Sequence, residues 1–317
     1  MRLRKAELAQ LSDGSRLDRD GHSSLRPTRP ETRLDCASPH WWKYLLCVDA
    51  VARFAQVCVQ ESPPLDLGLA AITCAFQSKV TEVQLIARLD ELAEGLAAKY
   101  RLEMGQDISW LSGAEFSRTL FGAEGFQGDQ LEYSSPSNSL LNEMLDRRRG
   151  IPITLTILGI EIGRRCGFNF FGIGMPGHFL MGEVGNSRQF FDPFEAGRVV
   201  SAQEARELFH AMHGHQHRFE EVFLAPAEPR QILMRVLNNL HAAFVNQGDP
   251  ENLERVLNLQ SVIPGYAKEA LGQLAGLLAT QGRFTDAAKI HDRLCLEDPT
   301  NLQGHERAAQ QLRARLN

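Results

Sequence analysis

Between about Trp41 and Leu102, hydrophobic positions recur at three- and four-residue spacing, which predicts a series of helices. The segments are WWKYLLCVDAVARFAQVC, then ESPPLDLGLAAITCAFQ, and then VTEVQLIARLDELAEGLAAKY. The last segment has the clearest amphipathic pattern, and the stripe expected to face the core is Val83, Ile86, Leu89, Leu92 and Leu96. Residues 103–137 are looser, and GAEGFQGDQLEYSSPS is predicted to be loop because Gly, Ser and polar residues dominate it.

Two more helices are predicted around an arginine run and a proline. SNSLLNEMLDRRRG should be a helix capped by Ser137 or Asn138 and stopped by Gly150. Pro152 suits a first helical turn and opens IPITLTILGIEIGRRCG. The β-branched residues of this segment favour a strand, whereas its length, its proline start and its terminal Gly167 favour a buried helix. We predict a helix.

After Gly167 the pattern changes to short apolar runs. FNFFGIG, HFLMGEV and RQFFDPF are separated by glycines or polar residues and predict three antiparallel strands. Helices followed by a small antiparallel sheet define an α+β fold, which we place at residues 40–220.

From Pro229 to the end the pattern is helical and repeats. LHAAFVNQGDPENLERVL begins at Leu240 and LAGLLATQGRFTDAAKIH at Leu274, an offset of 34 residues. Two helices joined by a Gly turn, with a 34-residue period, predict tetratricopeptide-type repeats over residues 229–317. The alternative is an unrelated helical bundle. Because two repeats cannot bury their faces alone, we expect them to dock on the α+β domain.

The chain's 317 residues carry a net charge of −5 with a sequence pI of about 6.1, so a nucleic-acid-binding surface is not expected. The six cysteines include no CxxC pair and indicate free thiols in a reducing, cytoplasmic setting. Residues 1–39 lack an apolar signal region and are predicted to be a disordered tail. We expect no membrane span, since no run of 18 apolar residues occurs, and no cofactor.

His178 follows Pro-Gly and Asp192 follows two phenylalanines, on two of the predicted strands. Adjacent strands could bring the two side chains together, and a carboxylate that fixes the tautomer of a buried histidine makes a general base. The alternative is a purely structural hydrogen bond.

Several segments in order resemble the bacterial SirB family: NSLLNEMLDRRRGIPITL, RRCGF, PGHFLMGE, DPFEAGRVVS and ILMRVLNNL. The resemblance runs from about residue 45 to 300. It implies a transglutaminase-like domain joined to tetratricopeptide repeats, and the family's name implies a role in regulation. The wider transglutaminase-like superfamily shares its core with papain-like peptidases and works with Cys, His and Asp.

The resemblance places His178 and Asp192 at the superfamily histidine and aspartate positions. The superfamily cysteine opens a helix, where the helix dipole favours the thiolate. That position falls here at Pro152 or Ile153, and neither side chain is a nucleophile. Thr154 is a candidate replacement, with a structural hydroxyl as its alternative. Cys166 lies at the far end of the same helix, about 20 Å away.

Polar residues outside this pair have two interpretations each. Arg147, Arg148 and Arg149 either pair with carboxylates such as Asp146, Glu143 or Asp192, or form an anion site at the rim of the cleft with Asn138. The histidine cluster is predicted to be a linker and not a metal site: His210, His213, His215 and His217.

Two functional hypotheses follow. The first is a non-catalytic regulatory protein that binds protein partners through the repeats and the cleft, without contacting nucleic acid or membrane. The second is an acyl-transfer or amide-hydrolysing enzyme in which Thr154, or a nucleophile supplied by a partner, works with His178 and Asp192.

Overall fold

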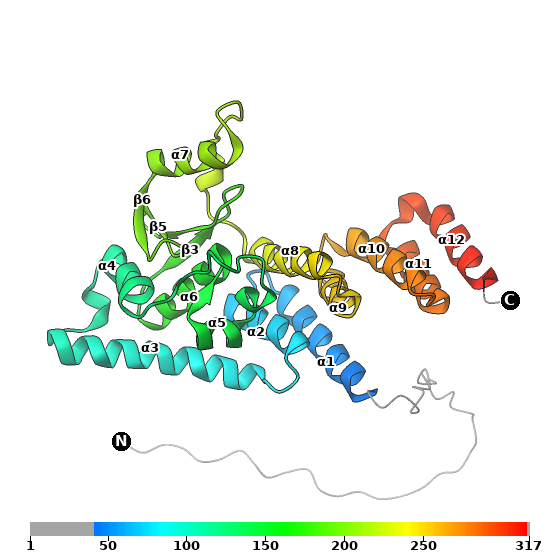
Figure 1. The fold of residues 1–317 in the computed structure, drawn as a ribbon, viewed down its shortest axis with the longest axis horizontal. Coiled ribbons are helices and arrows are strands. Elements are labelled where there is room, and N and C mark those ends of the chain that lie inside the picture. The colour runs from blue at the N-terminus through cyan, green and yellow to red at the C-terminus, as the bar shows by residue number, and fades with distance from the viewer. Residues whose placement is uncertain (1–40, 316–317) are drawn as a thin grey trace, which may run out of the picture. The chain divides into compact units, whose positions relative to one another are not determined.

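A computed structural model describes residues 41–315 of the chain (Figure 1). The first three predicted helices are confirmed, and their bounds are α1 (Trp41–Cys58), α2 (Leu65–Phe76) and α3 (Glu82–Met104). The predicted stripe of α3 is wrong in part, because Val83 is 79% exposed while Leu85 and Ala93 are buried with Leu89 and Leu96. Thr81 caps α3 in a capping box, so Val83 falls in the first turn on the solvent side.

Residues 103–137, described from the sequence only as looser, contain a helix that was not predicted, α4 (Gly113–Arg118), which continues into a π-turn over Thr119–Ala123. The segment predicted as loop, residues 122–137, starts at the end of this turn. Ser112 and Glu115 form the capping box that begins α4, and Phe116 is fully buried. The remaining elements are short: η1 (Ile108–Trp110), β1 (Gln127–Gly128) and η3 (Pro136–Ser139).

The helix predicted around the arginine run is α5 (Leu141–Arg147), shorter than expected at both ends. Asn138 belongs to the preceding 3-10 turn and does not cap the helix, whose N-cap position is Leu140. The chain leaves the helix at Arg148, which has a φ of 51°, and not at Gly150. Arg149 and Gly150 then form the two-residue strand β2, which pairs in parallel with β1.

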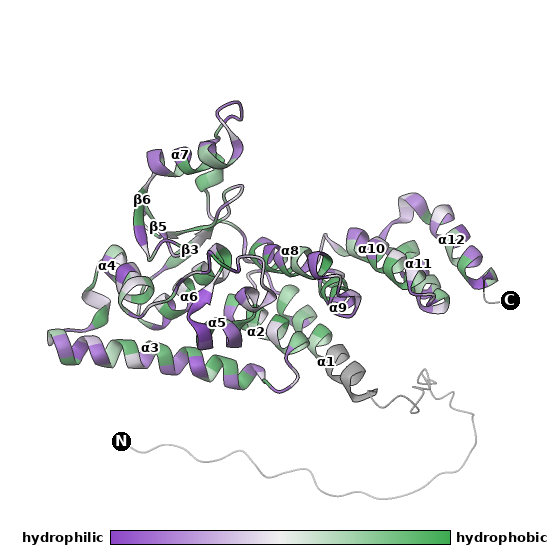
Figure 2. Cartoon of the chain, in the orientation of Figure 1, coloured by the Kyte–Doolittle hydropathy of each residue, from purple (hydrophilic) through white to green (hydrophobic). Residues whose placement is uncertain are grey.

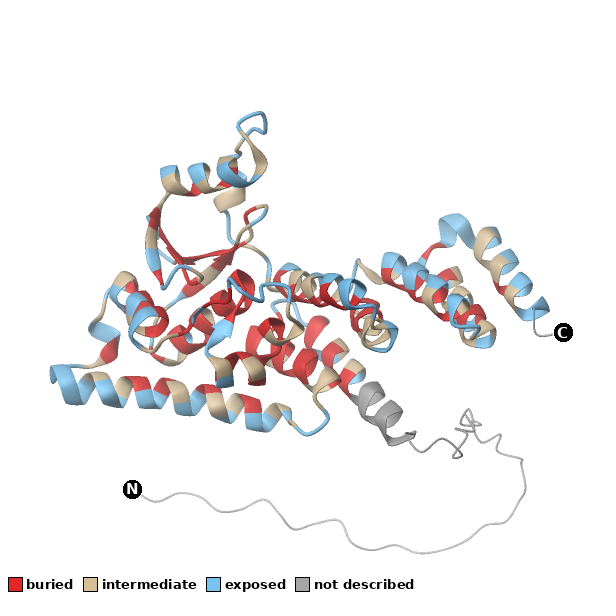
Figure 3. Cartoon of the chain, in the orientation of Figure 1, coloured by how far each residue is buried: buried red, intermediate tan, exposed pale blue. Residues whose placement is uncertain are grey.

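The helix predicted to begin at Pro152 is α6 (Pro152–Arg165), with Pro152 at its first position. Its partners lie on all sides, since it contacts α2, α3, α8 and the strands β3 and β4. Figure 3 shows α6 in the buried colour, and Leu155 and Ile162 have no exposed surface. Helix propensity and burial therefore outweigh the β-branched composition of this segment.

Three antiparallel strands were predicted, and the sheet contains a fourth. Its order is β3-β4-β5-β6 with all pairs antiparallel, and the bounds are β3 (Phe170–Ile173), β4 (Leu180–Glu183), β5 (Asn186–Asp192) and β6 (Arg198–Ser201). Helix α7 (Ala202–His213) follows β6 directly and covers a second, smaller hydrophobic cluster on the sheet. The arrangement is the predicted α+β type.

Five helices form the C-terminal part, and each contacts the next along the chain. Their bounds are α8 (Pro229–Gln247), α9 (Pro250–Gln260), α10 (Ala267–Thr280), α11 (Phe284–Glu297) and α12 (Leu302–Ala314). The expected docking is observed, because α8 contacts both α2 and α6 and contributes Leu233 and Leu237 to the main hydrophobic core. The tetratricopeptide assignment itself stays a prediction.

The hydropathy of the residues agrees with their burial in the structure. Figure 2 shows α3 with hydrophilic and hydrophobic residues alternating around it, in line with its position at the edge of the core. Among residues 41–315, no helix is long and apolar enough to cross a membrane. The predicted tail, residues 1–39, lies outside the described residues.

Candidate functional site

His178 and Asp192 lie in direct contact. The Nε2 atom of His178 is 2.8 Å from Oδ2 of Asp192, the carboxylate side chain is 1% exposed and the imidazole 12% exposed. The second carboxylate oxygen, Oδ1, accepts hydrogen bonds from the backbone N–H groups of Phe194 and Glu195. These bonds fix the carboxylate, which in turn orients the imidazole ring.

Local backbone geometry explains this placement. Asp192 ends β5, and Gly197 closes the following turn by donating its N–H to the carbonyl of Asp192. Gly197 has a φ of 73°, and a Cβ there would lie 2.4 Å from the carbonyl oxygen of Ser117, so only glycine fits. His178 comes from the turn before β4, in which its N–H donates to the carbonyl of Met175.

Strand β1 joins this pair to the first turn of α6. The N–H of Gly128 donates to the carbonyl of Phe194, while Asp129 donates its N–H to the carbonyl of Gly150. Gly128 and Gly150 are also partners in the β1–β2 ladder. The segment that carries Asp192 and the segment that opens α6 therefore lie on either side of β1.

The first turn of α6 offers no nucleophile at the positions that the sequence singled out. Pro152 and Ile153 are both buried. Thr154 is 1% exposed, and its hydroxyl donates to the carbonyl of Asn138 at 2.7 Å and accepts from the N–H of Ile151 at 3.2 Å. This geometry favours the structural alternative for Thr154, because its proton is already committed to a carbonyl.

Three buried or half-buried cysteines of the domain, Cys58, Cys74 and Cys166, do not supply the missing thiolate. Cys166 is the C-cap residue of α6, as expected, and burial raises the pKa of its thiol to about 11. Burial also raises the pKa of Cys58 to about 12 and that of Cys74 to about 11. None of these three thiols has the lowered pKa that a thiolate nucleophile requires.

The arginine run is paired, but not with the predicted carboxylates. Arg147 contacts Asp129 and donates to the side-chain oxygen of Asn138 at 2.6 Å. Arg148 contacts Glu124, and its guanidinium lies over the Phe126 ring. Arg149 donates to the carbonyl of Gly128. The named partners are wrong for Asp146, which pairs with Arg88, and for Asp192, which pairs with His178.

Asn138 has a positioning role in this network. It is fully buried, and its amide nitrogen donates to the carbonyl of Glu132 at 2.7 Å and lies 3.4 Å from that of Tyr133. With its oxygen bound by Arg147 and its carbonyl by Thr154, Asn138 holds the 132–139 loop against α5 and α6. These contacts occupy both the nitrogen and the oxygen of its side-chain amide.

The histidine cluster is helical in part, so the predicted linker is wrong there. His210 and His213 occupy the last turn of α7, which begins with a capping box between Ser201 and Glu204. His215 and His217 follow in a turn. Within the part of the chain that the structure describes, no group of three or more His, Cys, Asp or Glu side chains is arranged to hold a metal ion.

Three side chains around the pair, Phe194, Tyr133 and Arg235, were missed by the sequence interpretation. The ring of Phe194 lies 6.5 Å from the His178 ring and 5.9 Å from the Tyr133 ring, centroid to centroid. The guanidinium of Arg235, on α8, lies over the ring of Phe179 at 5.1 Å. Arg235 stands within the ILMRVLNNL segment, so a signal was present, whereas Tyr133 lies in a loop without periodicity.

A small open pocket of 120 Å³ begins beside Tyr133. It runs between the 133–139 loop and α8 and reaches Ile151, the N-cap residue of α6. Its lining is formed by Tyr133, Ser134, Ser135, Ser139, Ile151, Asn239, Ala242, Ala243 and Asn246. Serine and asparagine side chains there can hydrogen-bond a polypeptide backbone.

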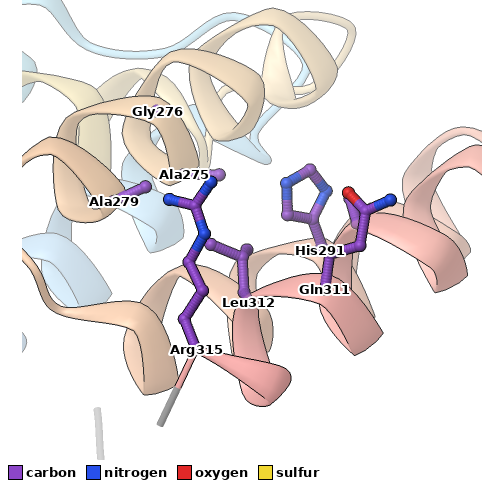
Figure 4. A pocket seen from close by; sticks show the side chains of 8 residues that line it. Ala275, Gly276, Ala279, His291, Gln311, Leu312 and Arg315 are labelled. Atoms are coloured by element: carbon purple, nitrogen blue, oxygen red, sulfur yellow. The ribbon is translucent and has the colours of Figure 1, made fainter.

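A second pocket, of 260 Å³, lies between α10, α11 and α12 (Figure 4). Figure 4 shows Arg315, Leu312 and His291 on one side and the small residues of α10 on the other. Its lining is formed by Ala275, Gly276, Ala279, His291, Ala308, Gln311, Leu312 and Arg315.

Comparison with known proteins agrees with the α+β fold. Residues 84–238 match the family model described as the transglutaminase-like superfamily. This stretch contains α3 to α7 and most of the paired side chains above, so the class of the domain is a transglutaminase-like one.

Individual proteins with similar sequences cover more of the chain than the family model does. A UPF0162 protein of Xylella fastidiosa (strain Temecula1) is 37% identical over 210 residues, which cover 62% of this chain and 75% of the relative. A UPF0162 protein of Pseudomonas aeruginosa is 26% identical over 258 residues, 80% of this chain and 90% of the relative. Human F-box only protein 21 is 27% identical over 132 residues, 39% of this chain and 20% of its own length. The chain belongs to the UPF0162 family. No solved structure matches it.

Proposed function

We propose that this chain is a non-catalytic regulatory protein of the SirB type, which binds a protein partner. Its transglutaminase-like cleft and its C-terminal helices, taken as tetratricopeptide-type repeats, are the two contact surfaces. The observation that carries the proposal is the intact pair of His178 and Asp192 beside a helix start occupied by Pro152 and Ile153. The orienting part of a triad would then be present without a nucleophilic side chain at Pro152 or Ile153, where the superfamily cysteine falls.

The rest of the cleft supports binding. The 120 Å³ pocket between the 133–139 loop and α8 is lined mainly by small or polar side chains, which suit an extended polypeptide segment. The pocket adjoins the α6 N-cap, where a superfamily enzyme would place its reacting group. A segment bound there would be held and not cleaved.

The C-terminal helices supply the second surface. The 260 Å³ groove in Figure 4 has small residues of α10 as one wall, which leaves room for a partner's side chains. The regulatory role would act through such protein contacts, since the net charge of −5 does not favour nucleic acid.

The first test is for turnover. We expect the purified full chain to show no hydrolysis of a glutamine amide or of p-nitrophenyl acetate, and no amine transfer to glutamine, above the rate of the Asp192→Ala variant. Turnover that Thr154→Val abolishes would overturn the proposal in favour of the second hypothesis, an acyl-transfer or amide-hydrolysing enzyme.

The second test separates the two surfaces in the full chain. Truncation at Pro229 is unsuitable because α8 contributes to the core. Gly276→Arg instead fills the C-terminal groove, since a Cβ at Gly276 meets nothing within 4 Å. Gly272→Arg is the matched control, because it lies on the same helix with the same free space but outside the groove.

A partner captured by the wild type should be reduced by Gly276→Arg or by His178→Ala, and not by Gly272→Arg. Equal capture by all four proteins would remove both surfaces from the proposal.

A further inference from the structure

Arg235 reaches the His178 turn from α8. Its Nη2 atom donates to the carbonyl of Met175 at 3.3 Å, and the same carbonyl accepts the backbone N–H of His178 at 3.2 Å. The guanidinium carbon lies over the ring of Phe179, the residue after His178, at 5.1 Å from the ring centroid. The cation is therefore held beside the His178–Asp192 pair from two directions.

Within the described residues, Arg235 forms no ion pair with a carboxylate. Burial lowers the pKa of this guanidinium, and the nearby Tyr133 phenol acts against that shift. A half-buried guanidinium without a carboxylate partner keeps N–H donors free for water or for a ligand. The arginine run at the end of α5 differs, because Arg147 and Arg148 already contact carboxylates.

Tyr133 completes the cation's surroundings. Burial raises the pKa of its phenol, and the nearby Arg235 works in the opposite direction. Its ring is braced edge-on by Phe194. A neutral phenol can donate its hydroxyl to the same acceptor as a guanidinium.

The face of α8 that carries Arg235 also contributes to the pocket. Arg235, Asn239, Ala242 and Asn246 are spaced at positions i, i+4, i+7 and i+11, which lie on one face of a helix. The last three line the 120 Å³ pocket together with Tyr133. Arg235 thus lies one helical turn before Asn239, on the face of α8 whose small or uncharged polar side chains line the groove.

We propose that Arg235 and Tyr133 form a carboxylate-binding subsite, which anchors the end or an acidic side chain of the polypeptide bound in the cleft. This subsite deepens the proposed function and rests on it. A planar carboxylate can accept two parallel N–H groups from the guanidinium fork and one hydroxyl from the phenol. The asparagine and serine side chains along α8 and the 133–139 loop would then meet the peptide backbone.

The test uses two random octapeptide libraries with acetylated N-termini, one ending in a free carboxylate and the other in an amide. Each is passed over the immobilised full chain, and retained peptides are identified by mass spectrometry. We expect the wild type to retain free-carboxylate peptides, or amidated peptides enriched in Asp and Glu. Arg235→Gln should weaken retention roughly tenfold to a hundredfold, because it removes a charge-assisted contact.

Three variants control the result. Arg235→Lys keeps the charge without the fork and should recover only part of the binding. Tyr133→Phe keeps the ring against Phe194 and should weaken binding severalfold, which tests the subsite even where Arg235→Gln disturbs the fold. Arg188→Gln removes one positive charge from an exposed position of β5 and should change nothing.

The outcomes separate the two proposals. Equal retention of both libraries by wild type and Arg235→Gln, with loss in Asp192→Ala, would overturn the subsite and leave the cleft as a binding site. Displacement of bound peptides by sodium phosphate but not by sodium propionate would overturn the choice of a carboxylate. Retention of neither library by the wild type would overturn both proposals.

Discussion

Two histidine–aspartate pairs lie in different regions of this chain. In the transglutaminase-like domain, His178 contacts Asp192 at 2.8 Å, and in the C-terminal helices His305 contacts Asp298 at 3.3 Å. Both carboxylate side chains are almost fully buried, at 1% and 6% exposed. The residue types and the contact are alike, so a motif search based on pairing alone would not separate them.

Their surroundings differ. Asp298 also contacts Lys268 at 3.1 Å and accepts the hydroxyl hydrogen of Thr300, and it is the C-cap residue of α11. Asp298 therefore stabilises the connection between α11 and α12, and all of these contacts come from side chains of the same protein. The turn that carries His178 instead accepts a hydrogen bond from Arg235, a cation that forms no ion pair with a carboxylate among the described residues. A functional interpretation therefore depends on the groups that remain unsatisfied beside a pair, and not on the pair.

The helices α6 and α12, one from each region, also differ in how many of their residues are buried. Helix α6 has 14 residues, of which 11 are buried, whereas α12 has 13 residues, of which Ala309 is the single buried one. Figure 3 shows this contrast directly. A rigid core fixes the cleft, and a lightly packed edge leaves the C-terminal groove accessible.

The largest expected effect is a loss of stability on substitution in the buried helix α6, compared with a small loss in the exposed helix α12. Leu155→Ala in α6 removes a fully buried side chain and should lower the free energy of unfolding by about 2–5 kcal/mol. Leu302→Ala in α12 removes a side chain that is 42% exposed, and its effect should stay below about 1 kcal/mol. Urea unfolding of both variants measures the difference. Similar losses would contradict the contrast between the two helices.

The next effect concerns the first pair. Asp192→Ala leaves the N–H groups of Phe194 and Glu195 without their acceptor and should cost about 3 kcal/mol, since such buried donors lose their hydrogen bonds. Asp192→Asn keeps one carbonyl oxygen for them and should cost less. If thermal unfolding shows the two variants to be equally destabilised, these backbone bonds do not set the position of the carboxylate.

Glycine substitutions should have opposite signs in the two regions. A Cβ at Gly163 in α6 would lie 2.5 Å from the ring of Phe170, which is packed between Phe168 and Phe191. Gly163→Ala should therefore destabilise by roughly 1–2 kcal/mol. Gly276→Ala in α10 meets nothing within 4 Å and should stabilise by about 0.5–1 kcal/mol through helix propensity. Calorimetry of both variants checks the signs, and a stabilising Gly163→Ala would refute the packing argument.

The sequence predicted those elements whose signals are local. Pro152 and Gly167 bracket α6, and alternating apolar runs located three strands of the sheet. The fourth strand, RVVS, was missed because four residues after a turn carry too little pattern to separate strand from loop. The wrong stripe of α3 has a similar cause, since Thr81 sets the helix start and hence the face on which Val83 falls.

For the candidate site, the adjacency of His178 and Asp192 could be predicted because the turn that carries His178 leads into β4 and Asp192 ends the neighbouring strand β5. Arg235 and Tyr133 could not, since they approach from a helix and a loop 102 residues apart in the sequence. Their proximity follows from the docking of α8 on the core, which no periodicity reports. Likewise, the partners of the arginine run were mispredicted because Glu124 and Asp129 reach it through the β1–β2 pairing.

The smallest expected effect sharpens the comparison through pH. Hydrogen bonds from Thr300, and then from Lys268, lower the pKa of Asp298 from 3.8 to about 2. Because the folded-state pKa lies below the unfolded value, this stabilisation is present above about pH 4 and is lost as the pH falls toward 2. The wild type should therefore resist urea better than Asp298→Asn at pH 6, and the gap between their midpoints should narrow between about pH 4 and pH 2. A gap that stays constant over that range would mean that the shape of the side chain, and not its charge, holds α11 to α12.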